Sequence, residues 1–457
     1  MRNHYRSGYL SRGSVLALLV GLAWSAHAED SATVNGITFY GAIDVGVTYD
    51  SHGVPASTYS SGGDNHLVGN TSNKAIWNFT QSDMGQSFIG LKGVEDLGGG
   101  WSGLFKLETG INPAGGNITD GLKAIANNNG KANNIRTAYN DSSMAGEAFN
   151  RGAYVGVSNE TYGTLTAGRQ TTLLSDLIGA YDPAYSSYAF SLIGTTSVYA
   201  GGGSSQGARW DNSVKYLYSQ GPFRLGLQYQ FGGTVTRNDN GFAGDIGFDW
   251  RGLSVDGVYL HKKDEVAGSS LGTSGATSLA AATAAGYDAA KTITGTVFDS
   301  DTFTLGAKYT WDKFKFYGAY EYIRSSNPSS PLSTGNVDIG GYVLFAPTNN
   351  AFQHDRIYDL LWAGLRYQAT SKLEVAGAYY YVHQNSYATG ANTGCNDTRA
   401  TTCDGETHVA SLVGNYFFSK RFQAYGGVMW SQVVNGQASG YFHNNNISPT
   451  AGVRYSF

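Results

Sequence analysis

Short segments in which apolar and polar residues alternate recur along the chain, and this pattern limits the fold more than any other feature. In Leu225–Gln230 the odd-numbered residues are apolar and the even-numbered ones small or polar, and Phe303–Trp311 repeats the pattern. Neighbouring side chains of a strand point to opposite faces, so each segment predicts a strand with one apolar and one polar face. Sixteen such segments are predicted, at residues 37–49, 87–95, 102–109, 151–158, 163–170, 212–219, 223–231, 242–250, 252–261, 302–311, 314–323, 358–368, 372–383, 408–418, 421–431 and 449–457.

The links between these segments alternate in length. Even-numbered links are short, as in Asp96–Gly100 and Asp312–Lys313. Odd-numbered links are long, at residues 50–86, 110–150, 171–211, 232–241, 262–301, 324–357, 384–407 and 432–448. This asymmetry and the even strand count predict an all-β fold, a closed 16-stranded antiparallel barrel that crosses a membrane. The link 262–301 is rich in Gly, Ser, Ala and Thr, which favours a flexible solvated loop over a short helical turn.

The first 28 residues have the pattern of an export signal. Arg2, Arg6 and Arg12 precede a short apolar core, and Ala26 and Ala28 supply the small residues of a cleavage site. An N-terminal membrane anchor is the alternative, but the apolar stretch is too short to span ~30 Å of hydrocarbon as a helix. We therefore predict a cleaved signal peptide at 1–28 and a single barrel domain at 29–457.

Composition fits an exported barrel better than a soluble domain. The chain has 63 Gly, 32 Tyr and only 14% charged residues, against about 25% in ordinary globular proteins. Removing the three signal arginines leaves 27 basic and 34 acidic residues, a net charge of −7, which argues against a nucleic-acid partner. Cys395 and Cys403 lie eight residues apart in a polar segment and predict one disulfide rather than a metal site. No metal and no cofactor is predicted.

Several blocks, taken in order along the chain, resemble the Gram-negative general porins of the β-proteobacterial type. Ile37–Gly46 (ITFYGAIDVG) is similar to the family's opening strand, and Gly90–Gly100 (GLKGVEDLGGG) to its second strand and turn. Ala153–Val157 (AYVGV) and Gly163–Gln170 (GTLTAGRQ) resemble two further strands, and the chain ends in Phe457, as such porins do.

The resemblance implies an outer-membrane channel through which small hydrophilic solutes and ions diffuse passively. It also implies a homotrimer in contact with outer-membrane lipid and lipopolysaccharide, short turns on the periplasmic side and long loops outside. The third long loop, about residues 171–211, is expected to fold into the lumen as a constriction, and Phe457 to be recognised by the barrel-insertion machinery. One departure concerns Phe88, which stands where the family commonly has Arg, so strong anion selectivity is not implied.

Alternation also predicts which charged side chains face the lumen, because charge on the lipid face costs roughly 2–4 kcal/mol for Arg or Lys at the midplane. Opposed rows of charge at a narrow neck orient solutes and bias ion choice. We predict Asp176 and Asp182 on the constriction loop, opposed by strand residues Lys92, Lys106, Lys215, Arg224 and Arg454. Arg169 falls in phase with apolar residues, so either a bulge at Gly168 re-aims it or it lies at the rim.

Other functions on the same barrel are weaker alternatives. A substrate-selective channel comes closest, followed by a surface adhesin. A hydrolase is disfavoured because the chain has no GxSxG, HExxH or P-loop in a suitable context, although a Ser–His pair could assemble between strands. The sequence therefore predicts a channel and no catalytic residues.

Overall fold

The computed structural model describes residues 33–457, except 61, 63–65, 140–144, 196–206, 233–238, 336–337, 389–394 and 398–399. The predicted cleavage site after Ala28 lies outside the described residues. None of the helices in the described part of the chain is long and apolar enough to cross a membrane.

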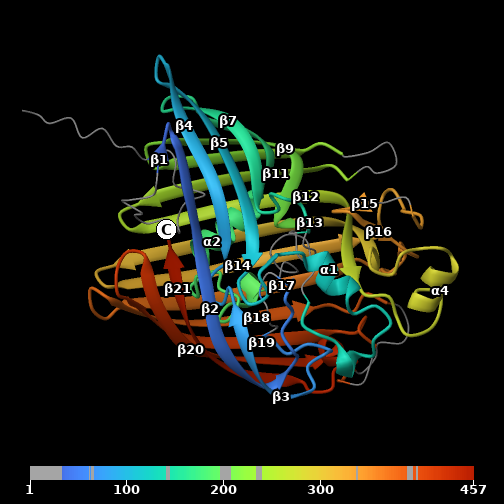
Figure 1. Cartoon of the computed structure of the whole chain (residues 1–457). Coiled ribbons are helices and arrows are strands. Elements are labelled where there is room, and N and C mark those ends of the chain that lie inside the picture. The colour runs from blue at the N-terminus through green and yellow to red at the C-terminus, as the bar shows by residue number, and fades with distance from the viewer. Residues whose placement is uncertain are drawn as a thin grey trace, which may run out of the picture.

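Sixteen antiparallel strands close into a barrel, as predicted, and Figure 1 shows them wound around a common axis. Each strand pairs with the next along the chain, and the first pairs with the last from Ala42–Ser456 to Thr48–Thr450. In order around the barrel they are β2 (Ile37–Gly53), β4 (Phe88–Gly98), β5 (Trp101–Asn112), β7 (Gly152–Asn159), β8 (Gly163–Thr171), β9 (Arg209–Gln220), β10 (Phe223–Gln230), β11 (Gly241–Trp250), β12 (Leu253–Ser269), β13 (Thr292–Trp311), β14 (Phe314–Ser326), β17 (Arg356–Gln368), β18 (Leu373–Gln384), β19 (Gly405–Phe417), β20 (Phe422–Asn435) and β21 (Asn445–Ser456).

Tight turns join the strands at the end where both described termini lie. The turn between β11 and β12 contains only Arg251 and Gly252, both with positive φ (46° and 88°), the backbone that a two-residue hairpin requires. Asp312 takes the same conformation (φ 51°) between β13 and β14. These turns fix the register of each hairpin, so the predicted alternation is preserved along the strands.

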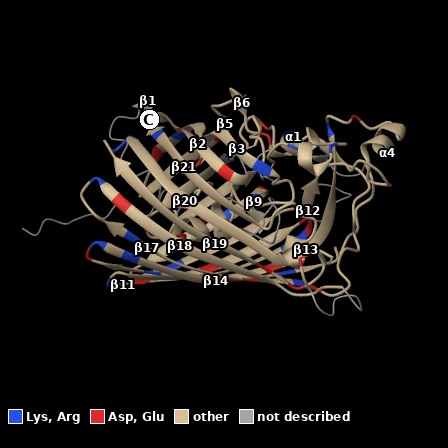
Figure 2. Ribbon diagram, turned by 90° about the horizontal axis from the view of Figure 1, so that it is seen from below, with Lys and Arg blue, Asp and Glu red and all other residues tan. Residues whose placement is uncertain are grey.

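The two faces of the strands differ as predicted. On β10, Leu225 and Leu227 are exposed on the outer face, whereas Gly226 and Gln228 are buried on the inner one. On β13, Phe303 and Leu305 are exposed while Thr304 is buried. Figure 2 shows that most of the visible outer wall is uncharged and that charged residues gather toward the strand ends.

The long-loop end contains more regular structure than predicted. The strand β3 (Lys74–Gln81) pairs with residues 45–53 of β2, and β4 pairs with residues 37–42 of the same strand. Residues 82–87 therefore separate β3 and β4, which lie one after the other along β2. The β12–β13 hairpin extends well beyond the predicted strands, and α4 (Leu279–Ala284) lies in its loop. The expectation of a flexible loop at 262–301 is therefore wrong. The described part of the chain also contains several small elements: β1 (Thr33–Val34), β6 (Asn117–Ile118), β15 (Asp338–Ile339), β16 (Tyr342–Leu344), α1 (Gly121–Ala126), α3 (Leu192–Thr195) and the 3₁₀ turns Asn133–Ile135 and Gly436–Ala438.

The second long loop crosses this end of the barrel. It leaves from β5 and returns to β7, yet α1 packs on β12 and β13, which lie far around the ring. Asn129 holds it there, because its side chain donates to the carbonyls of Ala289 and Thr292 (2.8 Å each) and accepts from the Leu271 N–H (2.7 Å). Figure 1 shows α1, α4, β15 and β16 gathered at this end. At this end, residues of several long loops thus share an apolar core with the extended β12–β13 hairpin.

Candidate functional site

The third long loop folds into the barrel, as predicted, and begins with the helix α2 (Leu173–Tyr181). Thr172 caps the helix by accepting a hydrogen bond from the Ser175 N–H (3.1 Å). The helix contacts β10 to β14. Two wall glycines make room for it: a Cβ on Gly226 would lie 2.8 Å from Leu173, and one on Gly306 would lie 2.7 Å from Tyr181. Side chains at these positions would push α2 off the wall.

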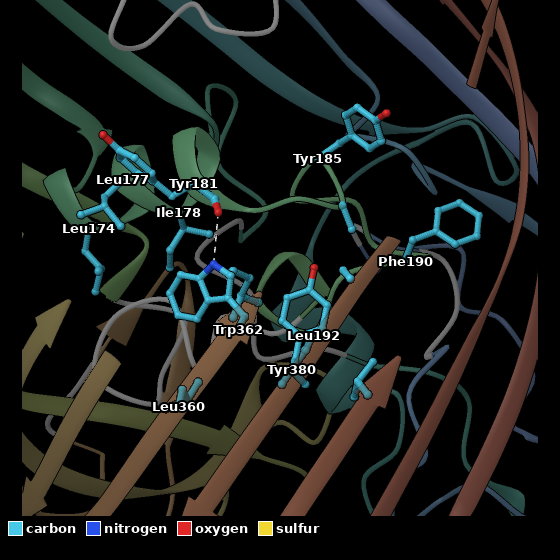
Figure 3. Close-up of a cluster of buried hydrophobic side chains, with 14 of the residues drawn as sticks. Leu174, Leu177, Ile178, Tyr181, Tyr185, Phe190, Leu192, Leu360, Trp362 and Tyr380 are labelled. Atoms are coloured by element: carbon cyan, nitrogen blue, oxygen red, sulfur yellow. Dashed lines mark hydrogen bonds between the residues drawn. The ribbon is translucent and has the colours of Figure 1, made fainter. Parts of the chain in front are cut away.

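An apolar core joins the third loop to the wall. Its loop side consists mainly of the buried face of α2 and the segment that follows, namely Leu174, Leu177, Ile178, Tyr181, Phe190, Leu192 and Ile193. Its wall side includes Leu360, Trp362 and Tyr380, whose inward-facing side chains are at most 3% exposed. Figure 3 shows these two groups facing one another. The inner wall here is apolar where a lumen surface would be polar, because the loop and not water covers it.

Hydrogen bonds fix the loop where α2 ends. Trp362 Nε1 donates to the Tyr181 carbonyl (3.1 Å), a bond drawn in Figure 3. Arg366 donates to the carbonyls of Asp182 (2.7 Å) and Pro183 (2.8 Å). These bonds satisfy carbonyl groups that the end of a helix leaves unpaired.

Asp182 does not face the lumen, so the prediction that it contributes to a charged row is wrong. Its side chain is completely buried and accepts hydrogen bonds from Tyr380 and from the N–H groups of Ala184 (3.1 Å) and Ser186 (2.6 Å). Sequence alternation could not show this, because Asp182 lies in a turn after a helix. It anchors the loop instead of facing solutes.

Asp176 and Lys215 are brought together but not as opposed rows. The Asp176 carboxylate forms an ion pair with Lys215, and Lys215 Nζ also donates to the Thr171 carbonyl (3.1 Å). The two side chains are only 10% and 6% exposed. This ion pair joins α2 to β9, and the charges of Asp176 and Lys215 cancel each other at the wall.

Arg224 likewise pairs with wall carboxylates. It forms ion pairs with Asp249 and with Asp256 (2.9 Å), and it donates to the Ser254 hydroxyl (3.2 Å). Tyr181 of the loop binds Asp256 as well. Arg224 therefore helps to hold the third loop against the wall, and two aspartates compensate its charge.

Arg454 sits beside the interruption between β3 and β4. It donates to the Gly85 carbonyl (2.6 Å) and lies 3.4 Å from the Asp44 carboxylate, which also accepts from the Tyr425 hydroxyl (2.6 Å). Asp44 is fully buried and Arg454 is 11% exposed. The pair holds the seam between the first and last strands, and little of its charge reaches the lumen.

The wall beyond the third loop carries cations with little compensation. Lys92 on β4 lies 4.8 Å above the ring of Tyr40 and, among the described residues, has no carboxylate partner. Lys106 on β5 pairs with Glu108 (3.0 Å) and keeps 23% of its side chain exposed. Glu108 also accepts from the Tyr40 hydroxyl (2.8 Å). Both predicted lysines thus lie on the inner face of neighbouring strands.

Two arginines that we did not single out from the sequence complete this surface. Arg151 stands just before β7, with its guanidinium 4.5 Å above the ring of Phe88 and its Nε 3.6 Å from Glu108. Arg209, the first residue of β9, donates to the Arg151 carbonyl (3.2 Å) and to the Gln86 side chain (3.3 Å). We call Lys92, Lys106, Arg151 and Arg209 the basic wall.

Arg169 lies outside this group. The register between β8 and β9 shifts between Gly168 and Gln170, so a bulge is present, with Gly168 at φ 130°. Arg169 nevertheless pairs across the strand with Ala153 and binds Asp211 (2.7 Å) and the Asn150 carbonyl (2.8 Å). Its partner Asp211 is 56% exposed, so Arg169 is tied to an exposed carboxylate near the long-loop end of β8.

The remaining predicted residues have structural contacts. Cys395 and Cys403 form a disulfide, with their Cα atoms 5.8 Å apart. The Phe457 backbone exchanges two hydrogen bonds with Gly41 (3.0 and 3.1 Å), and its ring lies 5.5 Å from that of Phe39. The final residue therefore completes the seam of the barrel.

Known proteins share both the sequence pattern and the fold. Residues 15–436 match the sequence profile of the family described as Gram-negative porin. An outer membrane porin protein of Bordetella pertussis is 30% identical over 223 residues, 49% of this chain, and the match spans about half (47%) of that relative's length. An anion-selective porin from Comamonas acidovorans has the same fold, with a TM-score of 0.58, 18% identity and coverage of 94% of this chain and 100% of the other. OmpT, an outer membrane protein of Vibrio cholerae, has a TM-score of 0.56 and 15% identity, with coverage of 94% of this chain and 100% of the other.

Proposed function

Because this chain belongs to the Gram-negative porin family, we propose that it forms a water-filled channel in the outer membrane through which small hydrophilic solutes diffuse, with a preference for anions. Family and fold indicate a channel rather than an enzyme. The basic wall is the observation that carries the anion preference.

The charge balance at the basic wall is positive. Among the described residues, Glu108 is the carboxylate that contacts the basic wall, through Lys106 and Arg151, so the four cations and this carboxylate sum to 4 − 1 = +3. Charges of one sign beside low-dielectric walls raise the local concentration of the opposite ion. An excess of this size at the narrowest part of a channel favours anions over cations.

The third loop supplies no free carboxylate to offset this charge within its described part. Asp176 is neutralised by Lys215, and Asp182 is buried against the wall. In the proposed neck, the charge of the described residues is therefore mainly positive. This differs from the predicted arrangement of two opposed rows, in which acidic side chains of the loop would face the basic side chains of the wall.

Liposome swelling with matched solutes tests the proposed activity. Refolded protein in vesicles should admit arabinose and also the similar-sized gluconate anion, and admit gluconate faster than an organic cation of the same size. A rate that scales linearly with solute concentration supports passive diffusion. Saturation at low concentration of one solute would instead support a substrate-selective channel, and no swelling with any solute would contradict the channel.

We also propose that the chain assembles as a homotrimer in contact with outer-membrane lipid and lipopolysaccharide. The apolar outer face supports a lipid environment, and the Vibrio cholerae OmpT neighbour is described in a trimer form. Phe457 is proposed as the residue read by the barrel-insertion machinery. Cross-linking of protein extracted in mild detergent tests the trimer, and deletion of Phe457 tests insertion, with loss of outer-membrane protein expected.

A further inference from the structure

We propose that Arg151, held against the ring of Phe88, gives the neck a preference for carboxylates over other small anions. This inference rests on the proposed anion-preferring channel and names the solute class that its neck binds best. Arg151 is the residue that meets the solute, and Phe88 positions it.

The guanidinium is held on one face by an aromatic ring. Phe88 lies on the inner face of β4, between the outward-facing residues of that strand, and the Arg151 guanidinium is 4.5 Å above its ring. An arginine over an aromatic face is stabilised by cation–π attraction and keeps its planar edge available. Gln86 accepts a hydrogen bond from Nη1 and so fixes one edge of the guanidinium. The guanidinium is therefore held in one orientation rather than moving freely.

Part of the guanidinium remains available to a ligand. Glu108 lies 3.6 Å from Nε, and that nitrogen is buried, so Nε is not the donor that meets a solute. Nη2 has no hydrogen bond within the described part of the chain, and 17% of the side chain is exposed. A planar fork of donors matches the two oxygens of a carboxylate and has no such match with a spherical halide. Lys92 and Lys106 on the adjacent strands add attraction without this geometry.

Phe88 therefore supports a cation, a role that the amino-acid sequence alone did not indicate. A ring at this position removes one positive charge from β4, but the same ring supports a guanidinium that arrives from the start of β7. The positive charge is thus supplied by the residue that precedes β7 instead of by β4. Ion preference then depends on the contact between residues 88 and 151, which are distant in sequence.

Bi-ionic reversal potentials in planar bilayers test the proposal with potassium chloride on one side and potassium acetate on the other. We expect the wild-type channel to pass acetate relative to chloride better than its free diffusion predicts. Arg151→Lys keeps the charge and loses the fork, so the acetate-to-chloride permeability ratio should fall while anion preference over potassium persists. Phe88→Leu keeps every charge and removes the ring, and should shift the ratio in the same direction. Lys313→Gln, in an exposed short turn, is the control and should change neither quantity.

The outcomes separate the two proposals. A wild-type channel without anion preference over potassium would overturn the proposed function. An anion-preferring wild type whose acetate-to-chloride ratio is unchanged by both Arg151→Lys and Phe88→Leu would overturn the inference alone. Single-channel conductance close to that of the wild type shows that each variant has folded and inserted.

Discussion

The contact between the third loop and the wall should depend strongly on Trp362. Its indole is 3% exposed, packs against the loop and donates to the Tyr181 carbonyl (3.1 Å). Replacing a buried aromatic residue with Ala costs roughly 3–5 kcal/mol, whereas losing one hydrogen bond costs about 0.5–1.5 kcal/mol. Trp362→Ala should therefore weaken docking of the loop by several times more than Trp362→Phe.

These energies translate into loop motion. Since each 1.4 kcal/mol is a tenfold change, Trp362→Ala should raise the undocked population about a hundredfold to several thousandfold, and Trp362→Phe about tenfold or less. The assay is single-channel recording, in which an undocked loop gives excess open-channel noise and brief closures. Leu361→Ala is the matched control, because that neighbour points outward and is 51% exposed. Equal noise in Trp362→Ala, Leu361→Ala and the wild type would refute the view that this core holds the loop.

Three further changes have defined outcomes. Asn129→Ala removes three hydrogen bonds between the second loop and the β12–β13 hairpin, and should speed proteolytic cleavage of residues 113–150 while leaving barrel unfolding unchanged. Cys395→Ser with Cys403→Ser should loosen only that loop, losing about 2–3 kcal/mol of local stability, and reduction of the wild type should reproduce the same cleavage pattern. Burial raises the pKa of Asp182, so the folded state binds this proton more tightly than the unfolded state. The free energy of unfolding of the wild type should fall as the pH rises from about 4 through that raised pKa. In Asp182→Asn, the free energy of unfolding in urea should depend less on pH over this range.

The strands could be predicted because, in the membrane-facing part of a barrel, side chains alternate between lipid and the barrel interior. Within that part, inward and outward positions differ in solvent, so alternation is strong. Beyond the membrane-facing part, this alternation is lost. Lys262–Glu265 has four consecutive charged residues and a register shift, and yet it lies in the extended β12. β3 was missed for a related reason, because Ser82, with φ 64°, breaks the strand between Gln81 and Phe88. Neither feature follows from local periodicity.

The site could be predicted only where a strand carries it. Lys92 and Lys106 follow from the phase of β4 and β5. Asp182 does not, because its direction depends on where α2 ends and on the distant Tyr380. Arg151 precedes its strand and is aimed by contact with Phe88 from an earlier segment. Such contacts join residues far apart in sequence, and a single chain gives no local signal for them.

The sign of the reversal potential for the wild-type channel in a tenfold potassium chloride gradient tests the central claim most directly. The proposed position of the basic wall at the neck, with the described loop carboxylates neutralised or buried, predicts a potential of the sign set by chloride permeation. Added salt should reduce its size through screening. A potential of the sign set by potassium, or none at all, would contradict the account.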